Sequence, residues 1–224
     1  MNDVRIVSST PSFSTRTERR HALAKADFVD AAYAVIEQHG FKGFTLDLVA
    51  SHVGLRKQAI YHYFPSKEAV LFEVALAELT RSAQAVADAV DKVESGVDAI
   101  EALLRTYFHA FAGKIRLFQI SHTALPFFDF KRMMSGDNLV RIRPLNDLLY
   151  AGAAQRLHAD SKGTLSLADA RRLAFVAYTS VVGLLTMKAL VESADDPLVH
   201  QDTAMIDTLV SVFRNSIAQG NKKK

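Results

Sequence analysis

Residues 45–64, TLDLVASHVGLRKQAIYHYF, predict two short helices joined by a tight turn. Thr45 is a favourable residue to cap the first helix, and Asp47 lies in its first turn, where the helix dipole favours negative charge. Gly54 suits the left-handed backbone that such a turn requires. We expect the second helix to cover residues 56–63. The apolar residues expected to face inward are Leu46, Val49, Ala50, Val53, Leu55 and Ile60.

The outer face of the second predicted helix carries side chains that can hydrogen-bond DNA. A helix held above the protein surface by a glycine turn can enter the major groove. Arg56, Lys57 and Gln58 can reach base edges or phosphates, and the Ala59 methyl can touch a thymine methyl. Residues 51–67 include no Asp or Glu that would repel a phosphate. His62 is expected to pack against the following helix instead of touching DNA. The residues predicted to contact DNA are Thr45, Arg56, Lys57, Gln58, Ala59, Tyr61, Tyr63 and Lys67.

This stretch resembles the DNA-binding domain of the TetR family of bacterial transcriptional regulators. The matching residues are Ala31-Ala32, Gly40-Phe41, Thr45, Val49-Ala50, Gly54-Leu55, Ile60-Tyr61, Tyr63-Phe64 and Ser66-Lys67-Glu68. Arg56 stands where the family usually has a small capping residue, and Gln58 stands where it often has glycine. The resemblance implies a DNA-binding function. Because the two departures lie at positions that face the DNA, it implies no particular operator sequence.

The composition is that of a globular protein and excludes several kinds of chemistry. The chain has 224 residues, of which 49% are hydrophobic and 23% are charged. It contains no cysteine, which excludes disulfides, thiolate metal sites and a cysteine nucleophile, and which suits a cytoplasmic location. The most apolar stretch, residues 174–187, is shorter than the ~20 residues that a membrane span needs, so we expect no membrane association.

Positive charge gathers in the first part of the chain. Residues 1–67 hold nine Lys and Arg against six Asp and Glu, whereas residues 68–224 hold eighteen of each kind. A basic end of the molecule is what a phosphate-binding surface requires. The charge distribution therefore agrees with the predicted DNA-binding helix pair.

Every later segment has helical periodicity, so the predicted fold class is all-α. A three-helix helix-turn-helix domain is expected to precede a larger helical bundle. The chain is divided into a flexible basic tail at residues 1–20, the helix-turn-helix domain at 21–67, and a ligand-binding and dimerisation domain at 68–220. The other helices are expected at residues 22–39, 66–93, 98–112, 138–158, 166–192 and 203–218, with a short helix after residue 114 and an irregular segment at 127–136.

The predicted bundle is rich in aromatic residues, which have two interpretations. One is a plain aromatic core. The other is a small-molecule site, since such sites are apolar pockets with a few polar groups, and the family resemblance implies that the pocket holds an effector. The aromatic content favours an apolar or aromatic effector. The candidate ligand-binding residues are Tyr107, Phe108, Phe111, Phe118, His122, Phe127, Phe128, Tyr150, Phe175 and Tyr178.

The last two predicted helices carry the expected oligomer contact. The family resemblance implies that they form a dimeric four-helix interface, although their apolar residues also suit an ordinary core. A homodimer would place two recognition helices about one DNA turn apart, ~34 Å, on a palindromic site.

No enzyme motif occurs in the sequence. It lacks a Gly-x-Ser-x-Gly elbow, a phosphate-binding Gly-x-x-x-x-Gly-Lys loop and a Gly-rich dinucleotide turn, and its histidines lack a metal-ligand spacing. We therefore expect no catalytic residue, metal or cofactor. The hypothesis is a homodimeric repressor that a small apolar or aromatic effector releases from a palindromic double-stranded DNA operator. The alternative is a DNA-bound scaffold that a protein partner regulates, with the aromatic residues as solid core.

Overall fold

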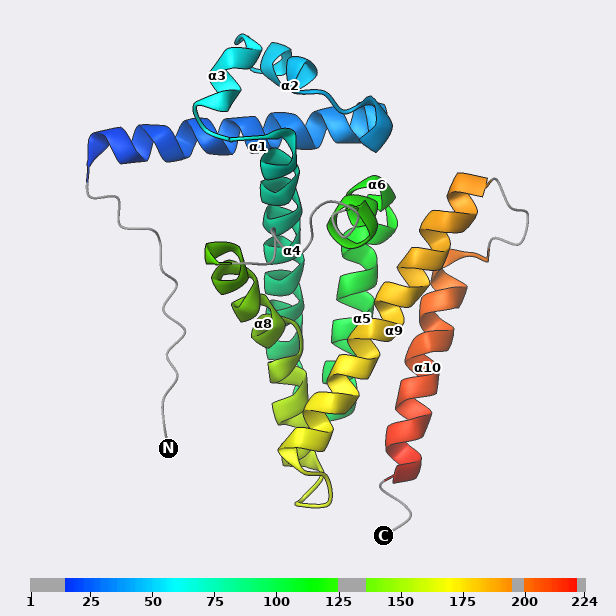
Figure 1. Ribbon diagram of the computed structural model, residues 1–224. Coiled ribbons are helices and arrows are strands. Elements are labelled where there is room, and N and C mark those ends of the chain that lie inside the picture. Colours follow the sequence, from blue (N-terminus) through cyan, green and yellow to red (C-terminus); the bar gives the residue numbers. More distant parts are fainter. Residues whose placement is uncertain (1–14, 125–135, 195–199, 221–224) are drawn as a thin grey trace.

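The computed structural model describes residues 15–124, 136–194 and 200–220, and every regular element within them is helical. The all-α class predicted from the sequence is confirmed. Figure 1 shows α1 across one end of the molecule with α2 and α3 on its outer side, and the bundle helices on its other side. The elements are α1 (Arg16–Gly43), α2 (Leu46–His52), α3 (Lys57–Tyr61), α4 (Lys67–Asp91), α5 (Gly96–Ala112), α6 (Ile115–Phe118), the π-helix η1 (Gln119–Ala124), α8 (Asp137–Asp160), α9 (Leu167–Ala194) and α10 (Asp202–Gly220).

Helix α1 begins earlier than the sequence analysis predicts. The Thr15 hydroxyl accepts a hydrogen bond from the Glu18 amide at 3.2 Å, and the Glu18 carboxylate accepts one from the Thr15 amide at 3.1 Å. This reciprocal cap starts the helix at Arg16. Residues 16–20, predicted to belong to a flexible tail, are therefore helical, and residues 1–14 lie outside the described part of the chain. Gly40, at φ 66° and ψ 179°, interrupts α1 where the sequence predicts its end.

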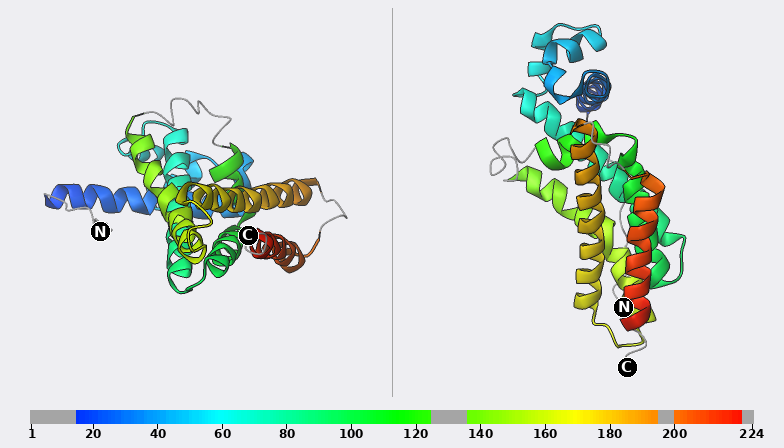
Figure 2. Two further views of the ribbon diagram at one scale, coloured as in Figure 1. Left: turned by 90° about the horizontal axis from the view of Figure 1, so that it is seen from below. Right: turned by 90° about the vertical axis from the view of Figure 1, so that its right-hand side faces the viewer.

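The core of the helix-turn-helix unit draws residues from both sides of the predicted domain boundary at residue 67. It contains buried side chains from α1, α2 and α3, joined by Val70 and Val74 of α4. Leu117 of α6 and Ile120 of η1 complete the same core, so α6 packs against α1. Figure 2 shows the helix-turn-helix unit projecting from one end of the elongated bundle. Its position on the bundle therefore depends on α4 and α6.

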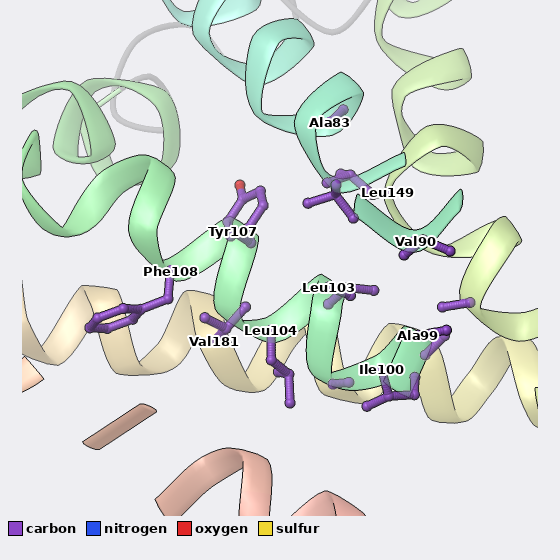
Figure 3. Close-up of a cluster of buried hydrophobic side chains, with 14 of the residues drawn as sticks. Ala83, Val90, Ala99, Ile100, Leu103, Leu104, Tyr107, Phe108, Leu149 and Val181 are labelled. Carbon is purple, nitrogen blue, oxygen red and sulfur yellow. The ribbon is translucent and has the colours of Figure 1, made fainter. Parts of the chain in front are cut away.

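Helix α5 runs through the larger core. Figure 3 shows its buried side chains among those of the neighbouring helices. At its start, Gly96 approaches α8 so closely that a Cβ would lie 2.5 Å from the Leu157 Cα. The absence of a side chain at this position therefore allows α5 and α8 to pack closely. The fully buried side chains of α5 are those of Ala99, Ile100, Leu103, Leu104, Tyr107, Phe108 and Phe111.

Helix α9 is apolar and only partly covered. By length and composition, its segment Leu167–Glu192 is long and apolar enough to cross a membrane, and it is the one such helix within the described residues. The helix is thus longer than the apolar stretch considered in the sequence. It nevertheless carries Arg171, Arg172 and Lys188, and it packs along α5 and α8. A single, weakly apolar helix of this kind does not indicate a membrane protein.

Candidate functional site

Local capping builds the helix pair that the sequence predicts. Thr45 Oγ1 accepts a hydrogen bond from the Leu48 amide at 3.2 Å and starts α2. Gly54 adopts φ +70°, which an L-residue rarely tolerates, and the next amide, that of Leu55, donates to the Ala50 carbonyl at 2.9 Å. The chain then enters α3 with fully buried Ile60 as its anchor. The predicted cap, turn and anchor are confirmed.

Helix α3 is shorter than predicted, and two side chains differ from their expected positions. It ends at Tyr61 instead of residue 63, and the amides of Tyr63 and Phe64 both donate to the Ile60 carbonyl at 2.9 Å. Leu55, predicted to face inward, is 51% exposed, since it lies in the turn before α3 begins. His62, predicted to pack against the following helix, is also exposed.

The side chains predicted to read DNA have different surroundings. Arg56, Gln58 and Tyr61 are exposed, so they are free of the protein core. Ala59 is half-buried. Tyr63 is also half-buried and packs on α1, with ring centroids 4.7 Å from His21 and 5.3 Å from Phe28.

Lys57 has an acidic partner that the sequence analysis missed. Its Nζ lies 2.9 Å from Asp47 Oδ2, and this hydrogen bond is the main reason why the pKa of Lys57 is raised. Asp47 belongs to α2 and therefore lies outside the acid-free stretch 51–67. The turn at Gly54 folds α3 back onto α2, so the two charges meet. Lys57 must exchange this partner for a phosphate when it binds DNA.

Lys67 is tied to the protein interior. Its Nζ donates a hydrogen bond to the Phe44 carbonyl at 2.7 Å and lies over the Phe44 and Phe41 rings, 5.3 and 5.9 Å from their centroids. The carbonyl belongs to the residue that ends α1, so Lys67 links α1 to the start of α4. This contact favours a structural role for Lys67, whereas its predicted phosphate contact stays a prediction.

A second cluster of polar groups is buried inside the bundle. The Tyr107 hydroxyl lies 2.8 Å from His122 Nε2 and 3.5 Å from the Tyr178 hydroxyl, joining α5, η1 and α9. His122 Nδ1 lies 3.3 Å from the Phe118 carbonyl. A carbonyl oxygen only accepts, so Nδ1 carries the imidazole hydrogen. In the neutral ring Nε2 is then the acceptor, and the Tyr107 hydroxyl donates to it.

Burial keeps this polar network uncharged near neutral pH. It lowers the pKa of His122 to about 4. Burial also raises the pKa of Tyr107 well above its ordinary value, with smaller contributions from Tyr178 and from the negative charge of Glu78. The pKa of Tyr178 is raised chiefly by burial as well. The imidazole and both phenols are therefore neutral at physiological pH.

Aromatic rings surround the network and include most of the predicted ligand-binding residues. Phe118 stacks on His122 with centroids 4.4 Å apart, and Phe111 meets the same imidazole edge-on at 5.5 Å. Tyr150 extends the group, with its centroid 6.4 Å from Tyr178 and 5.9 Å from Phe175. We call the seven residues Tyr107, Phe111, Phe118, His122, Tyr150, Phe175 and Tyr178 the aromatic cluster.

Three predicted ligand residues do not join the aromatic cluster in the described structure. Phe108 is fully buried but leaves α5 in a different direction from Tyr107, as Figure 3 shows. Phe127 and Phe128 lie outside the described residues. Phe175 does join the cluster but is 47% exposed, so it lies at the edge. No metal-binding group of His, Asp and Glu side chains occurs among residues 15–124, 136–194 and 200–220.

The segment that carries His122 also reaches the helix-turn-helix core. Phe118 and His122 belong to the aromatic cluster, while Leu117 and Ile120 pack into the core of α1 to α4. The guanidinium of Arg116 also donates a hydrogen bond to the Glu37 carbonyl of α1. This double contact was not predicted from the sequence, although the apolar pair Leu117 and Ile120, at i and i+3, is a signal of burial.

The fold and its exposed helix pair define a class of structure, a helix-turn-helix unit followed by an all-helical second domain. Residues 28–74 match the model of the family described as bacterial regulatory proteins, tetR family. The match covers the DNA-binding part of the chain and confirms the resemblance of that part to the TetR family. No curated protein matches the sequence significantly.

Solved structures have the same fold at low sequence identity. A putative transcriptional regulator from Pseudomonas aeruginosa PAO1 is 18% identical, with a TM-score of 0.59 over 94% of this chain and 96% of that chain. A TetR/AcrR-family regulator from Thermobifida fusca YX-ER1 is 17% identical, with a TM-score of 0.62 and coverage of 86% and 97%. The regulator FadR from Bacillus subtilis, solved in complex with stearoyl-CoA, is 15% identical, with a TM-score of 0.63 and coverage of 84% and 96%.

Proposed function

We propose that this protein is a cytoplasmic, homodimeric repressor, and not an enzyme, that a small molecule releases from a palindromic DNA operator. The observation that carries the proposal is the helix pair at residues 45–64. Its apolar side, represented by Ile60, is buried, while Arg56, Gln58 and Tyr61 are exposed on α3. Polar side chains held in this way on a short helix are suited to base edges and phosphates in a major groove.

The DNA contacts are assigned by the chemistry and exposure of each side chain. Arg56 and Gln58 read base edges, because their side chains are exposed and can form two hydrogen bonds with one base. Tyr61 and Lys57 bind phosphates, Lys57 after release from Asp47. Among the other predicted contacts, Thr45 uses its hydroxyl hydrogen on a phosphate, the Ala59 methyl meets a thymine, and Tyr63 reaches the backbone from its packed position.

Two exposed faces support the dimer. Helix α9 leaves apolar side chains exposed along one face, including Val176, Met187 at 57% and Leu190 at 59%. Val212 of α10 is 58% exposed. Apolar surfaces of this kind are typical of protein interfaces, and a second copy of the chain would cover them. Pairing through α9 and α10 gives each dimer two copies of α3.

Effector binding at the aromatic cluster is proposed to change the position of the helix-turn-helix unit through α6 and η1. These elements contact both the cluster, through Phe118 and His122, and the DNA-binding core, through Leu117 and Ile120. A ligand that moves the imidazole therefore moves side chains that pack beneath α1. For each tenfold loss of DNA affinity, the effector must favour the released state by about 1.4 kcal/mol. The stearoyl-CoA complex of FadR supports a ligand site in a protein of this fold.

The complete burial of Tyr107, Phe111 and Phe118 also favours a second candidate, in which the cluster is solid core. The protein is then a DNA-bound scaffold whose signal comes from a protein partner. The two candidates share the DNA-binding step and differ in whether any small molecule stabilises the purified protein.

DNA selection from a randomised duplex library tests the proposal. The full chain should enrich a palindrome, and Gln58→Ala should lose preference at one position in each half-site. Gln84→Ala, an exposed change on α4, is the matched control and should select the wild-type sequence. Failure to bind any duplex at low salt would refute the proposed function.

Light scattering tests the dimer separately. Leu190→Glu should produce a monomer, because it places a charge on the exposed apolar face of α9. Val140→Glu is the control, since Val140 is 66% exposed and belongs to α8, which is not one of the two helices of the proposed interface. A wild-type monomer at micromolar concentration would contradict the dimer.

A further inference from the structure

We propose that the effector is an uncharged molecule with a flat apolar body and a hydrogen-bond acceptor, such as a ketone or ester carbonyl, that takes the hydroxyl hydrogen of Tyr178. This inference rests on the proposed ligand-responsive function and specifies the chemistry of its site. The geometry of the aromatic cluster supports it in three independent ways.

The directions of the hydrogen bonds leave the Tyr178 hydroxyl as a donor in a weak hydrogen bond. Tyr107 gives its hydroxyl hydrogen to His122 Nε2 at 2.8 Å, as the position of the Phe118 carbonyl requires. Tyr178 must then be the donor to the Tyr107 oxygen, and that contact is 3.5 Å long. A hydrogen bond of this length is weak, so an incoming acceptor can take the Tyr178 hydrogen at little cost.

The charges around the cluster disfavour an anionic ligand. His122 is neutral, and its described ring contacts are with aromatic side chains. The charged group that acts on Tyr107 is the buried carboxylate of Glu78, whose own partners are Arg81 and Lys114. A carboxylate ligand beside Tyr178 would lose its hydration without gaining a cation from this network. A cationic ligand would likewise meet, among the described residues of this network, only the Glu78 carboxylate, which already has cationic partners.

The rings set the shape of the molecule and its side of approach. Phe111, Phe118 and Tyr107 are fully buried, whereas Tyr150 and Tyr178 keep some solvent-accessible surface. Phe175 lies at the outer edge of the same group, 5.9 Å from the Tyr150 ring centroid. A flat apolar molecule that enters past Tyr150 can stack on these rings and present its acceptor to Tyr178.

Three naphthalenes of nearly equal size test the acceptor and the charge. The probe is 6-propionyl-2-dimethylaminonaphthalene, an uncharged fluorescent ketone, and its displacement from the full chain is measured with 2-acetylnaphthalene, 2-ethylnaphthalene and 2-naphthoate. The ketone should bind about 2- to 10-fold more tightly than the hydrocarbon, as one neutral hydrogen bond allows. The naphthoate should bind at least about 100-fold more weakly than the ketone, because its charge is desolvated without a partner. Equal binding of naphthoate and ketone would overturn the charge assignment.

Conservative variants identify the donor. Tyr178→Phe should remove the preference for 2-acetylnaphthalene over 2-ethylnaphthalene while leaving the affinity for the hydrocarbon unchanged. Tyr150→Phe is the matched control, because it removes a hydroxyl from the same aromatic cluster and should keep the preference. Loss of the preference in Tyr150→Phe, or its retention in Tyr178→Phe, would overturn the assignment. Both variants keep their rings, and a circular dichroism melt verifies that they fold.

The same titrations separate this inference from the proposed function. Binding in the predicted order without any change in operator affinity would support the ligand chemistry and refute the proposed release from DNA. A wild-type protein that binds its operator but none of the three compounds, nor the probe, would refute the aromatic cluster as a ligand site and favour the scaffold. DNA binding is measured on the same preparation by fluorescence anisotropy.

Discussion

Asp47 is predicted to restrain DNA binding by holding Lys57. The two charges lie 2.9 Å apart across the turn at Gly54, and both side chains are exposed, at 66% for Asp47 and 41% for Lys57. Asp47→Asn keeps the shape of the side chain but removes its charge. The variant should therefore free the Lys57 ammonium for a phosphate and remove a negative charge next to the DNA.

The size of the effect follows from counterion release. One additional phosphate contact steepens the plot of log affinity against log salt by about 0.9. A fourfold rise in salt, from about 50 to about 200 mM, should then cost the variant about 3.5-fold more affinity than it costs the wild type. The loss of a negative charge from the first turn of α2 should lower stability by about 0.3 to 1 kcal/mol, because it interacted favourably with the helix dipole.

Fluorescence anisotropy with a labelled operator duplex across a salt series measures this change. Asp88→Asn is the charge-matched control, since it changes the net charge equally at an exposed site on α4, which extends away from α2 and α3 in Figure 1. When Lys57 is also replaced by Gln, Asp47→Asn should leave the slope of log affinity against log salt unchanged. An equally steeper slope in the double variant, or in Asp88→Asn, would refute the restraint of Lys57 by Asp47.

Substitutions of four other residues test the roles assigned to them. Arg56→Ala should cost about 1 to 3 kcal/mol of operator binding and relax the preference at one base pair, because the exposed side chain is assigned to a base edge. Uniform weakening of binding across a sequence library would contradict this assignment. Lys67→Met should lower the free energy of unfolding by about 1 to 2 kcal/mol, since it leaves the Phe44 carbonyl without this donor, and should not alter the salt slope of DNA binding. Gly54→Ala should cost about 1 to 2 kcal/mol in urea denaturation, because its φ of +70° is strained for alanine. The His122 pKa of about 4 lies below that of an unfolded histidine. The contribution of neutral His122 to the free energy of unfolding is therefore complete above about pH 6.5 and is lost as the pH falls toward 4. Between about pH 7 and pH 5, the free energy of unfolding of the wild type should fall by about 2 kcal/mol more than that of His122→Gln, as measured by urea titration. Equal decreases in the two proteins would show that the imidazole is not buried.

Features of the helix-turn-helix unit that depend on local chemistry were predictable. The Thr45 cap, the left-handed Gly54 and the buried Ile60 each follow from residues a few positions apart. The inward prediction for Leu55 was wrong, because a shift of the start of α3 to Lys57 moved Leu55 from the helix face into the turn. Helix ends are the parts of a pattern that neighbouring contacts alter most easily.

Contacts between distant segments were not predictable in the same way. Lys67 reads as a surface cation in the sequence, but its ammonium meets the carbonyl of Phe44, 23 positions earlier. Asp47 and Lys57 are 10 positions apart and meet only because the turn reverses the chain. Leu117 has an ordinary apolar sequence context, and only the packing of α6 on α1 assigns it to the DNA-binding core.

The amino-acid sequence by itself determined the helices, their caps and the polar face of α3, because these depend on periodicity and on hydrogen bonds within one or two turns. Only the tertiary structure decided which polar groups meet. Tyr107 and His122 are 15 positions apart, and Tyr107 and Tyr178 are 71 positions apart, so no local pattern relates their hydroxyls and imidazole. Packing of α5, η1 and α9 brings these groups together, and burial then fixes their protonation states.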